Sequence, residues 1–262
     1  MNKIQLVIAD WAGTTVDYGC FAPVNAFEKA FQAFDIHPSM DEIREPMGLL
    51  KIDHIRAMLN MERIRGQWLE KYGKDPQDGD VTAIYRVFEE KLMESLSEYA
   101  LPKPGVTEAM EKLRGMGIRI GSTTGYTDEM MDVVKKKAAE NGYSPDACFT
   151  PDSTGGFGRP YPYMIFSNMK AFAIQSVENV IKVGDTASDI REGKNAGVCS
   201  LGIIEGSSML GLSQEEYEAL SAEEKEARHD DVRRRYFEAG ADDVLESLSE
   251  LPEWIRRKES GR

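Results

Sequence analysis

The most informative part of this sequence for its architecture is the segment IQLVIADWAGTT, residues 4–15. Its first six residues are uncharged and mostly apolar, and they run into Asp10 and then into a Gly-Thr turn. An apolar run of this length predicts a strand of a parallel sheet that is buried on both faces. Asp10 then stands at the carboxyl end of that strand, which is where open parallel sheets bind their ligands.

Further along the chain, apolar runs alternate with helical patterns. The runs cover residues 118–121, the region near Phe149, residues 180–183 and residues 198–204, and the helical patterns cover residues 108–116, 128–141, 163–173 and 188–195. Strands that alternate with helices indicate an α/β fold, so we expect a Rossmann-like parallel sheet. Asp10, Ser122, Thr124 and Asp185 would all lie at its carboxyl edge.

One long segment interrupts this alternation. Between Phe21 and Tyr99 the apolar residues recur at helical spacing, and no strand pattern is found. We therefore predict an all-helical cap, residues 21–99, inserted into a core made of residues 1–20 and 100–262. The charged tail predicts one or two solvated helices over residues 213–238, and further helices over residues 241–248 and 253–258.

Charge and composition exclude several functions. The net charge of −13 disfavours partners such as nucleic acid and anionic membranes. The cysteines, Cys20, Cys148 and Cys199, are far apart and resemble neither a zinc site nor a disulfide framework, so a reducing cytoplasmic setting fits. No signal peptide or membrane-spanning run is found.

Carboxylates follow two of the predicted strands. Asp10 ends the first, and Asp185 and Asp189 follow the run at residues 180–183. Taken singly, each group reads equally well as an ordinary turn or helix cap. Together they would form an acidic cluster that calls for a cation, and an all-oxygen ligand set favours Mg²⁺.

Two further segments suit an anion. Ser122 and Thr124 lie where a strand leads into a helix, so that hydroxyls, free N–H groups and the helix dipole point at one place. Arg159 stands in a glycine-rich loop and could close the same site. The plainer alternatives are a polar helix cap and a surface arginine.

The order Asp10, Ser122/Thr124, Arg159 and Asp185/Asp189 resembles the haloacid dehalogenase-like superfamily over residues 1–20 and 100–205. The resemblance implies that Asp10 is the nucleophile that takes the phosphoryl group. It also implies that Asp10, the carbonyl of Ala12 and Asp185 bind Mg²⁺, with Asp189 supporting the metal site. Most members have a lysine where this chain has Arg159.

Position 12 departs from the common pattern. Phosphatases and mutases of the superfamily usually carry a second aspartate two residues after the nucleophile, where it protonates the leaving alkoxide. This chain has a methyl group, Ala12. The leaving group must therefore be stabilised in another way.

The cap contains a candidate for that role. Lys51 opens a helix pattern after PMGLL, residues 46–50, and His54 shares its face. On the helix pattern alone, Lys51 is an ordinary solvated lysine. Residues 10–23 together with 46–51 closely resemble phosphonoacetaldehyde hydrolases (phosphonatases), as do residues 121–127, 158–161 and 206–208.

This second resemblance extends nearly end to end and implies a mechanism. Lys51 would form a Schiff base with the aldehyde of phosphonoacetaldehyde, and Asp10 would attack phosphorus. The family positions that line the site would be Cys20, Met47, Gly48, His54 and Tyr126. The family also implies a homodimer joined through the caps. Seven cap aromatics would support it, because they offer more aromatic surface than a thin helical layer readily buries alone: Phe27, Phe31, Phe34, Trp68, Tyr72, Tyr85 and Phe88. The alternative is that these aromatics form the cap's own small core.

Three other functions share parts of this pattern. A Mg²⁺-dependent phosphatase has the same core, but Ala12 argues against it. A 2-haloacid dehalogenase uses an aspartate nucleophile without metal, and the retained Asp185 and Asp189 argue against that. A phosphonate-binding protein with a decayed site would have lost Asp10 or Lys51, and neither is lost.

Overall fold

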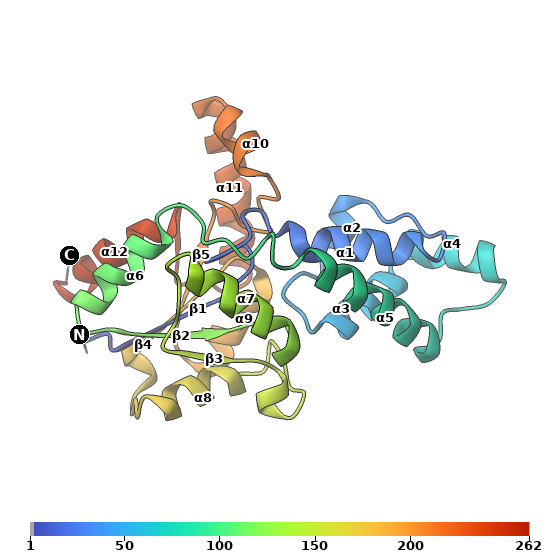
Figure 1. Cartoon of the computed structure of the whole chain (residues 1–262). Coiled ribbons are helices and arrows are strands. Elements are labelled where there is room, and N and C mark those ends of the chain that lie inside the picture. The colour runs from blue at the N-terminus through green and yellow to red at the C-terminus, as the bar shows by residue number, and fades with distance from the viewer. Residues whose placement is uncertain (1–2, 262) are drawn as a thin grey trace.

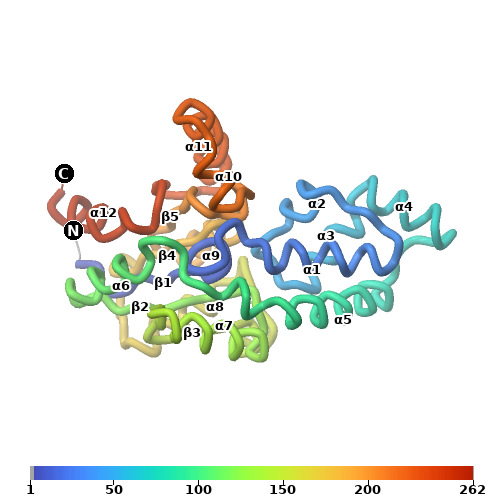
Figure 2. Tube along the Cα trace, turned by 45° about the horizontal axis from the view of Figure 1, so that its top comes forward, coloured from blue at the N-terminus to red at the C-terminus, as the bar shows by residue number. Residues whose placement is uncertain are grey.

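The computed structural model describes residues 3–261 and contains an α/β core with a helical cap at one side (Figure 1). The first and the last described segments of the chain lie near each other on the side of the core away from the cap, in both Figure 1 and Figure 2. There the N–H of Ile4 donates to the Glu259 carboxylate at 2.8 Å. The fold class predicted from the sequence is confirmed.

The core is built on a six-stranded parallel sheet with the order β3-β2-β1-β4-β5-β6. The strands are β1 (Leu6–Ala9), β2 (Arg119–Thr123), β3 (Ala147–Phe149), β4 (Val180–Gly184), β5 (Cys199–Ile203) and β6 (Asp243–Leu245). In the centre of the sheet, Ala9 is in register with Ser122 of β2 and Val183 of β4. The residues that follow these three strands therefore meet at one edge.

Helices cover both faces of this sheet. On one face α8 (Tyr163–Ala171) and α9 (Ala187–Ala196) pack on Leu6 and Ile8. On the other, α6 (Val106–Gly115), α7 (Asp128–Glu140) and α12 (Leu251–Glu259) contribute to the core that contains Val7 and Ala9. Because successive side chains of a strand point to opposite faces, the uninterrupted apolar run of β1 serves both layers.

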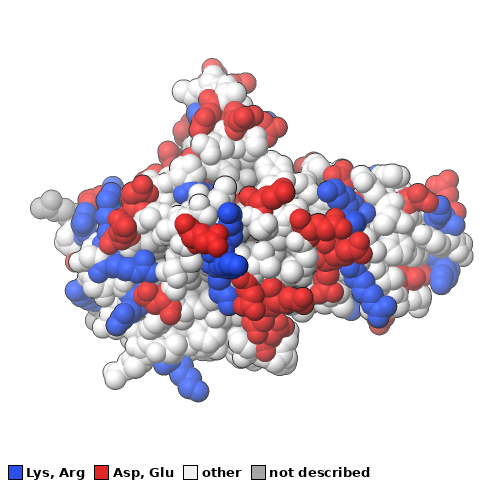
Figure 3. All heavy atoms as spheres, in the orientation of Figure 1, with Lys and Arg blue, Asp and Glu red and all other residues white. Residues whose placement is uncertain are grey.

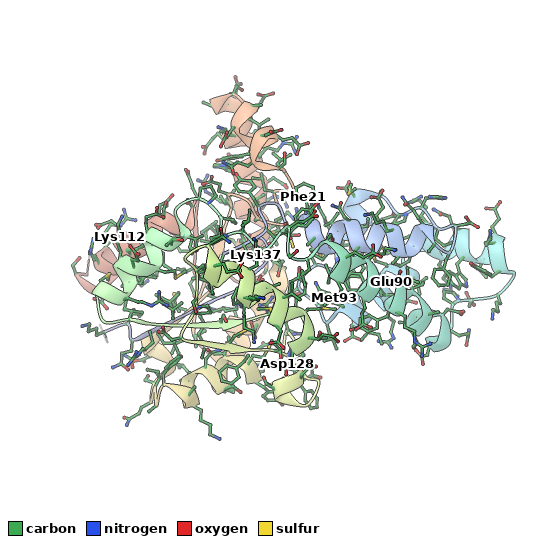
Figure 4. The ribbon with its side chains drawn as sticks, in the orientation of Figure 1. Phe21, Glu90, Met93, Lys112, Asp128 and Lys137 are labelled. Carbon is green, nitrogen blue, oxygen red and sulfur yellow. The ribbon has the colours of Figure 1, made fainter. Side chains whose placement is uncertain are left out.

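The predicted all-helical insertion is confirmed. Between β1 and α6 the chain forms α1 (Phe21–Gln32), α2 (Met40–Arg44), α3 (Lys51–Asn60), α4 (Glu62–Tyr72) and α5 (Asp78–Ser95). Helix α1 packs against α5, and α3 packs against α5. In Figure 4, Phe21, the first residue of α1, lies at the end of the cap that meets the core.

The cap has a small aromatic core of its own. Phe27 stacks on Phe88 with ring centroids 4.2 Å apart, and Phe27, Phe31, Phe88 and Trp68 are all buried. The expectation that the cap has more aromatic surface than it can bury is therefore wrong for these four, because α1, α4 and α5 enclose them. Of the other three, Tyr72 is exposed and Phe34 and Tyr85 are half-buried.

The tail differs from its prediction in one place. Helices α10 (Gln214–Ala219) and α11 (Ala222–Glu238) form as expected, each opened by a serine capping box at Ser213 or Ser221. Residues 241–248, predicted as a helix, instead contain the edge strand β6, and a 3₁₀ turn follows at Leu248–Glu250. Pairing of β6 with β5 overrides the weak local helix pattern.

Charges of both signs are spread over the surface, and acidic side chains gather where the core meets the cap on the face shown in Figure 3. Among residues 3–261, none of the helices combines the length and apolar character that a membrane span requires.

Candidate active site

A small pocket of about 20 Å³ lies between the carboxyl edge of the sheet and the cap. From the core it is lined by Asp10, Ala12, Thr124, Gly125, Tyr126, Arg159, Asp185 and Thr186, and from the cap and its entry by Cys20, Met47, Gly48 and Lys51. Ten of the thirteen residues predicted for the site line this pocket. The other three are Ser122 and His54, which are placed differently, and Asp189, predicted as a supporting residue, whose carboxylate lies in one cluster with those of Asp10 and Asp185.

Asp10 and Arg159 form the centre of the pocket. Arg159 is 6% exposed, and its guanidinium donates to the Asp10 carboxylate and, at 3.0 Å, to the carbonyl oxygen of Thr123. Its Nε also donates to the carboxylate of Glu192 at 3.1 Å. Burial works against the charge, but the neighbouring carboxylates raise the pKa of Arg159 well above its usual value. A permanent cation therefore lies beside the predicted nucleophile.

The carboxylates of Asp10, Asp185 and Asp189 form a buried cluster that could hold a metal ion, with oxygens that lie within 4.8 Å of one another. Burial, together with the negative charge of Asp10, raises the pKa of Asp185 well above its usual value. A bound cation would remove that repulsion. Gly13 makes room for the carboxylate of Asp185, since a Cβ at residue 13 would lie 2.1 Å from Oδ2. The residues present therefore fit a divalent ion with oxygen ligands.

Asp189 is occupied by other partners. It accepts from Lys182 at 2.6 Å and from the hydroxyl of Thr186 at 2.6 Å, and Arg159 lies 3.1 Å away. Although burial opposes ionisation, Arg159 and Lys182 lower the pKa of Asp189. Within residues 3–261, Asp185 accepts hydrogen bonds from neutral donors alone, the hydroxyl of Thr14 at 3.2 Å and the N–H of Ser208 at 2.8 Å. Asp185 is therefore the freer metal ligand, and Asp189 suits a supporting position.

The two predicted hydroxyls are used differently. Ser122 lies inside β2 and donates its proton to the carbonyl of Ala147 in β3, away from the pocket. Thr124 lines the pocket, and its hydroxyl oxygen accepts from the N–H of Tyr126 at 3.1 Å. That leaves the proton of Thr124 available for an oxyanion. The geometry favours Thr124 over Ser122 for contact with a phosphoryl group.

Lys51 is the first residue of α3 and is buried, with 6% exposed. Burial lowers the pKa of its ammonium group, although the negative charges of Asp10 and Asp185 oppose this shift. The Nζ atom lies 5.2 Å from the ring centroid of Tyr126 and 5.8 Å from that of Phe27. Among residues 3–261, Lys51 has no carboxylate within ion-pair distance. The environment of Lys51 therefore favours the neutral amine more than the environment of a solvated lysine does.

His54 lies behind Lys51 and does not line the pocket. Its ring stacks on Phe27 at 3.8 Å, and Nε2 lies 2.9 Å from the carbonyl oxygen of Ile43. Burial, and then the charge of Lys51, lowers the pKa of His54 well below its usual value, so the imidazole is neutral. With its proton on Nε2 for Ile43, the buried Nδ1 has no hydrogen-bond partner among the described residues.

Cys20 and Tyr126 complete the apolar side of the pocket. Both are buried, and burial raises the pKa of the Cys20 thiol and of the Tyr126 hydroxyl well above their usual values. Both groups are therefore neutral near pH 7. The hydroxyl of Tyr126 has no hydrogen-bond partner among the described residues, so it is free to bond with a ligand.

The loop before α3 brings the cap onto the core. Gly48 has φ +87°, and a Cβ there would lie 2.3 Å from the hydroxyl oxygen of Thr186. Next to it, the carbonyl of Met47 accepts from the hydroxyl of Ser188 at 3.4 Å. Only glycine allows this close approach at a positive φ, which explains the residue type at position 48.

Several functional residues were missed from the sequence. Lys103 is buried, donates to the carbonyl oxygens of Gly13 and Glu205, and so fixes the turn that follows the predicted nucleophile. Burial lowers the pKa of Lys103 to about 8. Lys182 and Glu192 form a buried ion network with Asp189 and Arg159. The signal for this network was a lysine inside the apolar run of residues 180–183.

Comparison with known proteins agrees with this geometry. A sequence model of haloacid dehalogenase-like hydrolases matches residues 4–197. A phosphonoacetaldehyde hydrolase of Lysinibacillus sphaericus (strain C3-41) is 51% identical over 250 residues, which cover 95% of this chain and 93% of that protein. A crystal structure of a phosphonoacetaldehyde hydrolase-like protein from Oleispira antarctica matches with a TM-score of 0.94 and 34% identity, covering 100% of this chain and 96% of that one.

A longer relative is also found. The bifunctional phosphonoacetaldehyde hydrolase/aminoethylphosphonate transaminase of Clostridioides difficile (strain 630) is 50% identical over 259 residues, or 99% of this chain. The chain spans 41% of the length of that protein. On the extent and identity of these matches, the chain belongs to the haloacid dehalogenase-like hydrolases and, within them, to the phosphonoacetaldehyde hydrolase family.

Proposed function

We propose that this protein hydrolyses the P–C bond of phosphonoacetaldehyde, giving acetaldehyde and phosphate. The observation that carries the proposal is that Lys51 and Asp10 line the same small pocket, beside the methyl group of Ala12. A buried lysine without a carboxylate partner suits imine formation, and a P–C bond is the kind of bond that an imine helps to break. The names of the relatives support the same reaction.

The first step joins the substrate to the cap. The neutral amine of Lys51 attacks the aldehyde carbon, loss of water gives an imine, and the imine takes up a proton to become an iminium ion. The low pKa that burial gives Lys51 raises the fraction of amine that can attack. His54 holds its proton on Nε2, which leaves its buried Nδ1 as an acceptor without a partner among the described residues. We infer that it positions Lys51, or a water beside it, for proton transfer.

The second step breaks the P–C bond. A carboxylate oxygen of Asp10 attacks phosphorus, and the electron pair of the P–C bond moves into the iminium ion to give a neutral enamine. Arg159 and the hydroxyl of Thr124 donate to the phosphonate oxygens and offset their charge. The leaving group is a carbon that the imine already stabilises, so the reaction needs no acid at position 12.

The remaining steps release the products. Protonation of the enamine and hydrolysis of the imine release acetaldehyde and restore Lys51. Water then hydrolyses the aspartyl phosphate and restores Asp10, so the sum is addition of one water across the P–C bond. We propose that Asp10, Asp185 and the carbonyl of Ala12 hold Mg²⁺, which, when bound, offsets the negative charge of the carboxylates and the phosphonate.

The two other enzyme classes fit the pocket less well. A phosphatase would need a carboxylic acid to protonate its leaving group, and Asp10 and Asp185 are the only carboxylates among the described residues that line the pocket. A metal-free dehalogenase would have no use for the buried cluster of Asp10, Asp185 and Asp189. Loss of function by decay is disfavoured because both Asp10 and Lys51 are present and buried.

The reaction also has a place in a sequence of reactions. A relative carries a hydrolase and an aminoethylphosphonate transaminase in one protein. Removing the amine of 2-aminoethylphosphonate by transamination leaves an aldehyde, which is phosphonoacetaldehyde. We therefore propose that this protein acts in degradation of 2-aminoethylphosphonate, in the cytoplasm, where its three free cysteines suit a reducing setting.

We further propose that the protein is a homodimer joined through the cap. Support comes from apolar side chains on the outside of the cap: Met40 is 45% exposed, Leu69 40% and Tyr72 38%. Leu69 and Tyr72 lie on α4, and a second copy could cover them. Sedimentation at micromolar concentration tests this, and a monomer there would contradict it.

The experiment that tests the proposed function is a measurement of acetaldehyde and phosphate released from phosphonoacetaldehyde, with Mg²⁺ and with chelator. We expect equal amounts of both products with Mg²⁺ and strong loss of both with chelator. A simple phosphate ester serves as the comparison substrate. Faster hydrolysis of the ester than of phosphonoacetaldehyde would overturn the proposal.

A further inference from the structure

A second and larger cavity lies next to the candidate active site. It has a volume of about 350 Å³, against about 20 Å³ for the active-site pocket. Its walls come from the end of α2 and the cap loop before α3, and from α9, α11 and the segment after β5 of the core. They are formed by Arg44, Glu45, Pro46, Met47, Leu49, Thr186, Ala187, Ser188, Arg191, Ser208, Met209, Arg235, Glu238 and Ala239.

Three arginines give this cavity a local charge opposite to that of the whole protein. Arg44, Arg191 and Arg235 line it, and among residues 3–261 none of them has a carboxylate within ion-pair distance. Arg44 donates only to carbonyl oxygens, those of Gly19 at 2.9 Å and Ser208 at 3.2 Å. Such cations retain their capacity to bind an anion.

Two carboxylates also line the cavity, but they do not neutralise it. Glu238 is already paired with Arg234 outside the cavity, at 2.9 Å. Glu45 is exposed and has no cation within 4.0 Å among the described residues. The cavity therefore holds three unpaired cations against one unpaired carboxylate, in a protein with a net charge of −13.

A buried hydroxyl in the wall also lacks a partner. Ser208 is 2% exposed, and its Oγ makes no hydrogen bond to any described residue. A buried hydroxyl without a partner costs free energy, so its presence indicates a ligand or water at that place. Ser208 lines the cavity, and so do Ala187 and Ser188 in the first turn of the ten-residue helix α9, where free N–H groups favour an anion.

The cavity and the candidate active-site pocket share two wall residues, Met47 and Thr186. The active-site pocket has room for about one water. The larger cavity therefore adjoins the active-site pocket across a wall that includes Met47 of the cap loop.

We propose that this cavity is a second binding site for a small tetrahedral oxyanion, where the anion waits beside the active pocket. That the anion is the phosphonate substrate or the phosphate product rests on the proposed function. Arg191 and Arg235 provide the cations that approach it from α9 and α11, and Ser208 provides a hydroxyl.

Binding of inorganic phosphate tests the site without any turnover. Equilibrium dialysis with labelled phosphate and Mg²⁺ would compare the whole protein with the variant Arg191→Ala/Arg235→Ala. The matched control, Arg228→Ala/Arg257→Ala, removes the same charge from exposed positions outside both cavities. We expect the wild type and the control to bind one phosphate per chain more than the cavity variant does, two against one when the active-site pocket also binds phosphate. Equal phosphate counts in the wild type and the cavity variant would overturn the proposal.

Kinetics provide a second readout. At low salt, KM for phosphonoacetaldehyde should rise roughly three- to tenfold in the cavity variant relative to the control, and the difference should shrink as salt screens the arginines. A KM equal to that of the control at low salt would contradict a role in the passage of substrate. If the wild type releases no acetaldehyde, the proposed function fails, while the phosphate count still reports on the second site.

Discussion

The core side and the cap side of the pocket differ in whether their buried charged groups have ion-pair partners. On the core side Arg159, Asp189, Lys182 and Glu192 are buried and paired with one another. On the cap side Lys51 is buried among Phe27, Tyr126 and neutral groups, with no carboxylate close enough to pair with it. The core thus holds fixed, paired charges around Asp10, while the cap favours removal of a charge from an amine.

If the two sides have these roles, each should be essential, the cap side for imine formation and the core side for attack on phosphorus. Asp10→Asn and Lys51→Arg should each lower turnover by about 10⁴-fold or more, because each removes a nucleophile. Steady-state release of acetaldehyde measures the loss. Lys74→Arg, at an exposed cap lysine, is the matched control and should keep wild-type activity. Full activity in Lys51→Arg would end the account of the cap side.

Removal of the metal should affect the core side alone. Chelation should lower turnover by roughly 10³-fold, since the cation offsets several kcal/mol of charge in the transition state. Mg²⁺ at about 100 times its Kd should also stabilise the fold by about 2.7 kcal/mol. Thermal unfolding with and without Mg²⁺ checks this independently of activity. Asp185→Asn should lose most of the Mg²⁺-dependent shift in Tm, and an undiminished shift would place the ion elsewhere.

Ala12 lies where the core side and the cap side meet. Ala12→Asp would place a carboxylate near Lys51, and so remove the difference in charge between the two sides. The new carboxylate would favour Lys51 as ammonium, repel the phosphonate and crowd the imine. We expect kcat/KM for phosphonoacetaldehyde to fall by about 100-fold, or about 2.7 kcal/mol in barrier, with a slight gain on phosphate esters. Ala12→Asn adds similar volume without charge and separates the two causes. A change within about twofold, roughly 0.4 kcal/mol, would make Ala12 incidental.

Sequence patterns predicted the sheet edge and the cap because both depend on local signals. The apolar run before Asp10 and the helical spacing before Tyr99 are visible within a few residues. Strand β6 was not, because Asp243–Leu245 is too short for a pattern and depends on its pairing with β5. Sequence spacing likewise could not decide between Ser122 and Thr124, since only the position of β3 gives Ser122 an acceptor.

The network of buried charges behind the site could not be predicted from the sequence either. Lys103 and Glu205 are separated by about a hundred residues, and Lys103 meets the carbonyl of Glu205 only in the folded chain. The cap aromatics show a different limit of the sequence. Their number suggested that some of them lie on the outer surface of the cap, yet Phe27 and Phe88 stack on each other inside it. Composition does not reveal which faces of neighbouring helices meet.

The smallest expected effect concerns pH. Because burial lowers the pKa of Lys51 from its ordinary 10.5, the folded protein holds the amine neutral at lower pH than the unfolded chain does. The rate of imine formation should therefore rise about tenfold per pH unit at low pH and become constant at high pH. The midpoint of this curve, which is the pKa of Lys51, should lie below 10.5. Rapid-mixing measurements of imine formation in Asp10→Asn check this. A midpoint at 10.5 or above would mean that the cap side does not favour the neutral amine.

The lowered pKa of Lys51 also makes the free energy of unfolding depend on pH. The unfolded chain binds more protons at Lys51 than the folded chain does, so this residue makes the fold less stable as pH falls below 10.5 through its lowered pKa. Lys51→Met should therefore be more stable than the wild type near pH 7, and the difference should shrink at high pH. Thermal unfolding across that range measures it.

The central claim is that Lys51 forms an imine before Asp10 attacks phosphorus, and borohydride trapping tests it most directly. Borohydride added with phosphonoacetaldehyde should leave a reduced adduct on Lys51, located by mass spectrometry of peptides. In the wild type the adduct should be an ethyl group, because the P–C bond has broken, and in Asp10→Asn it should retain the phosphonate. An adduct missing from Lys51, or one without phosphonate in Asp10→Asn, would contradict the account.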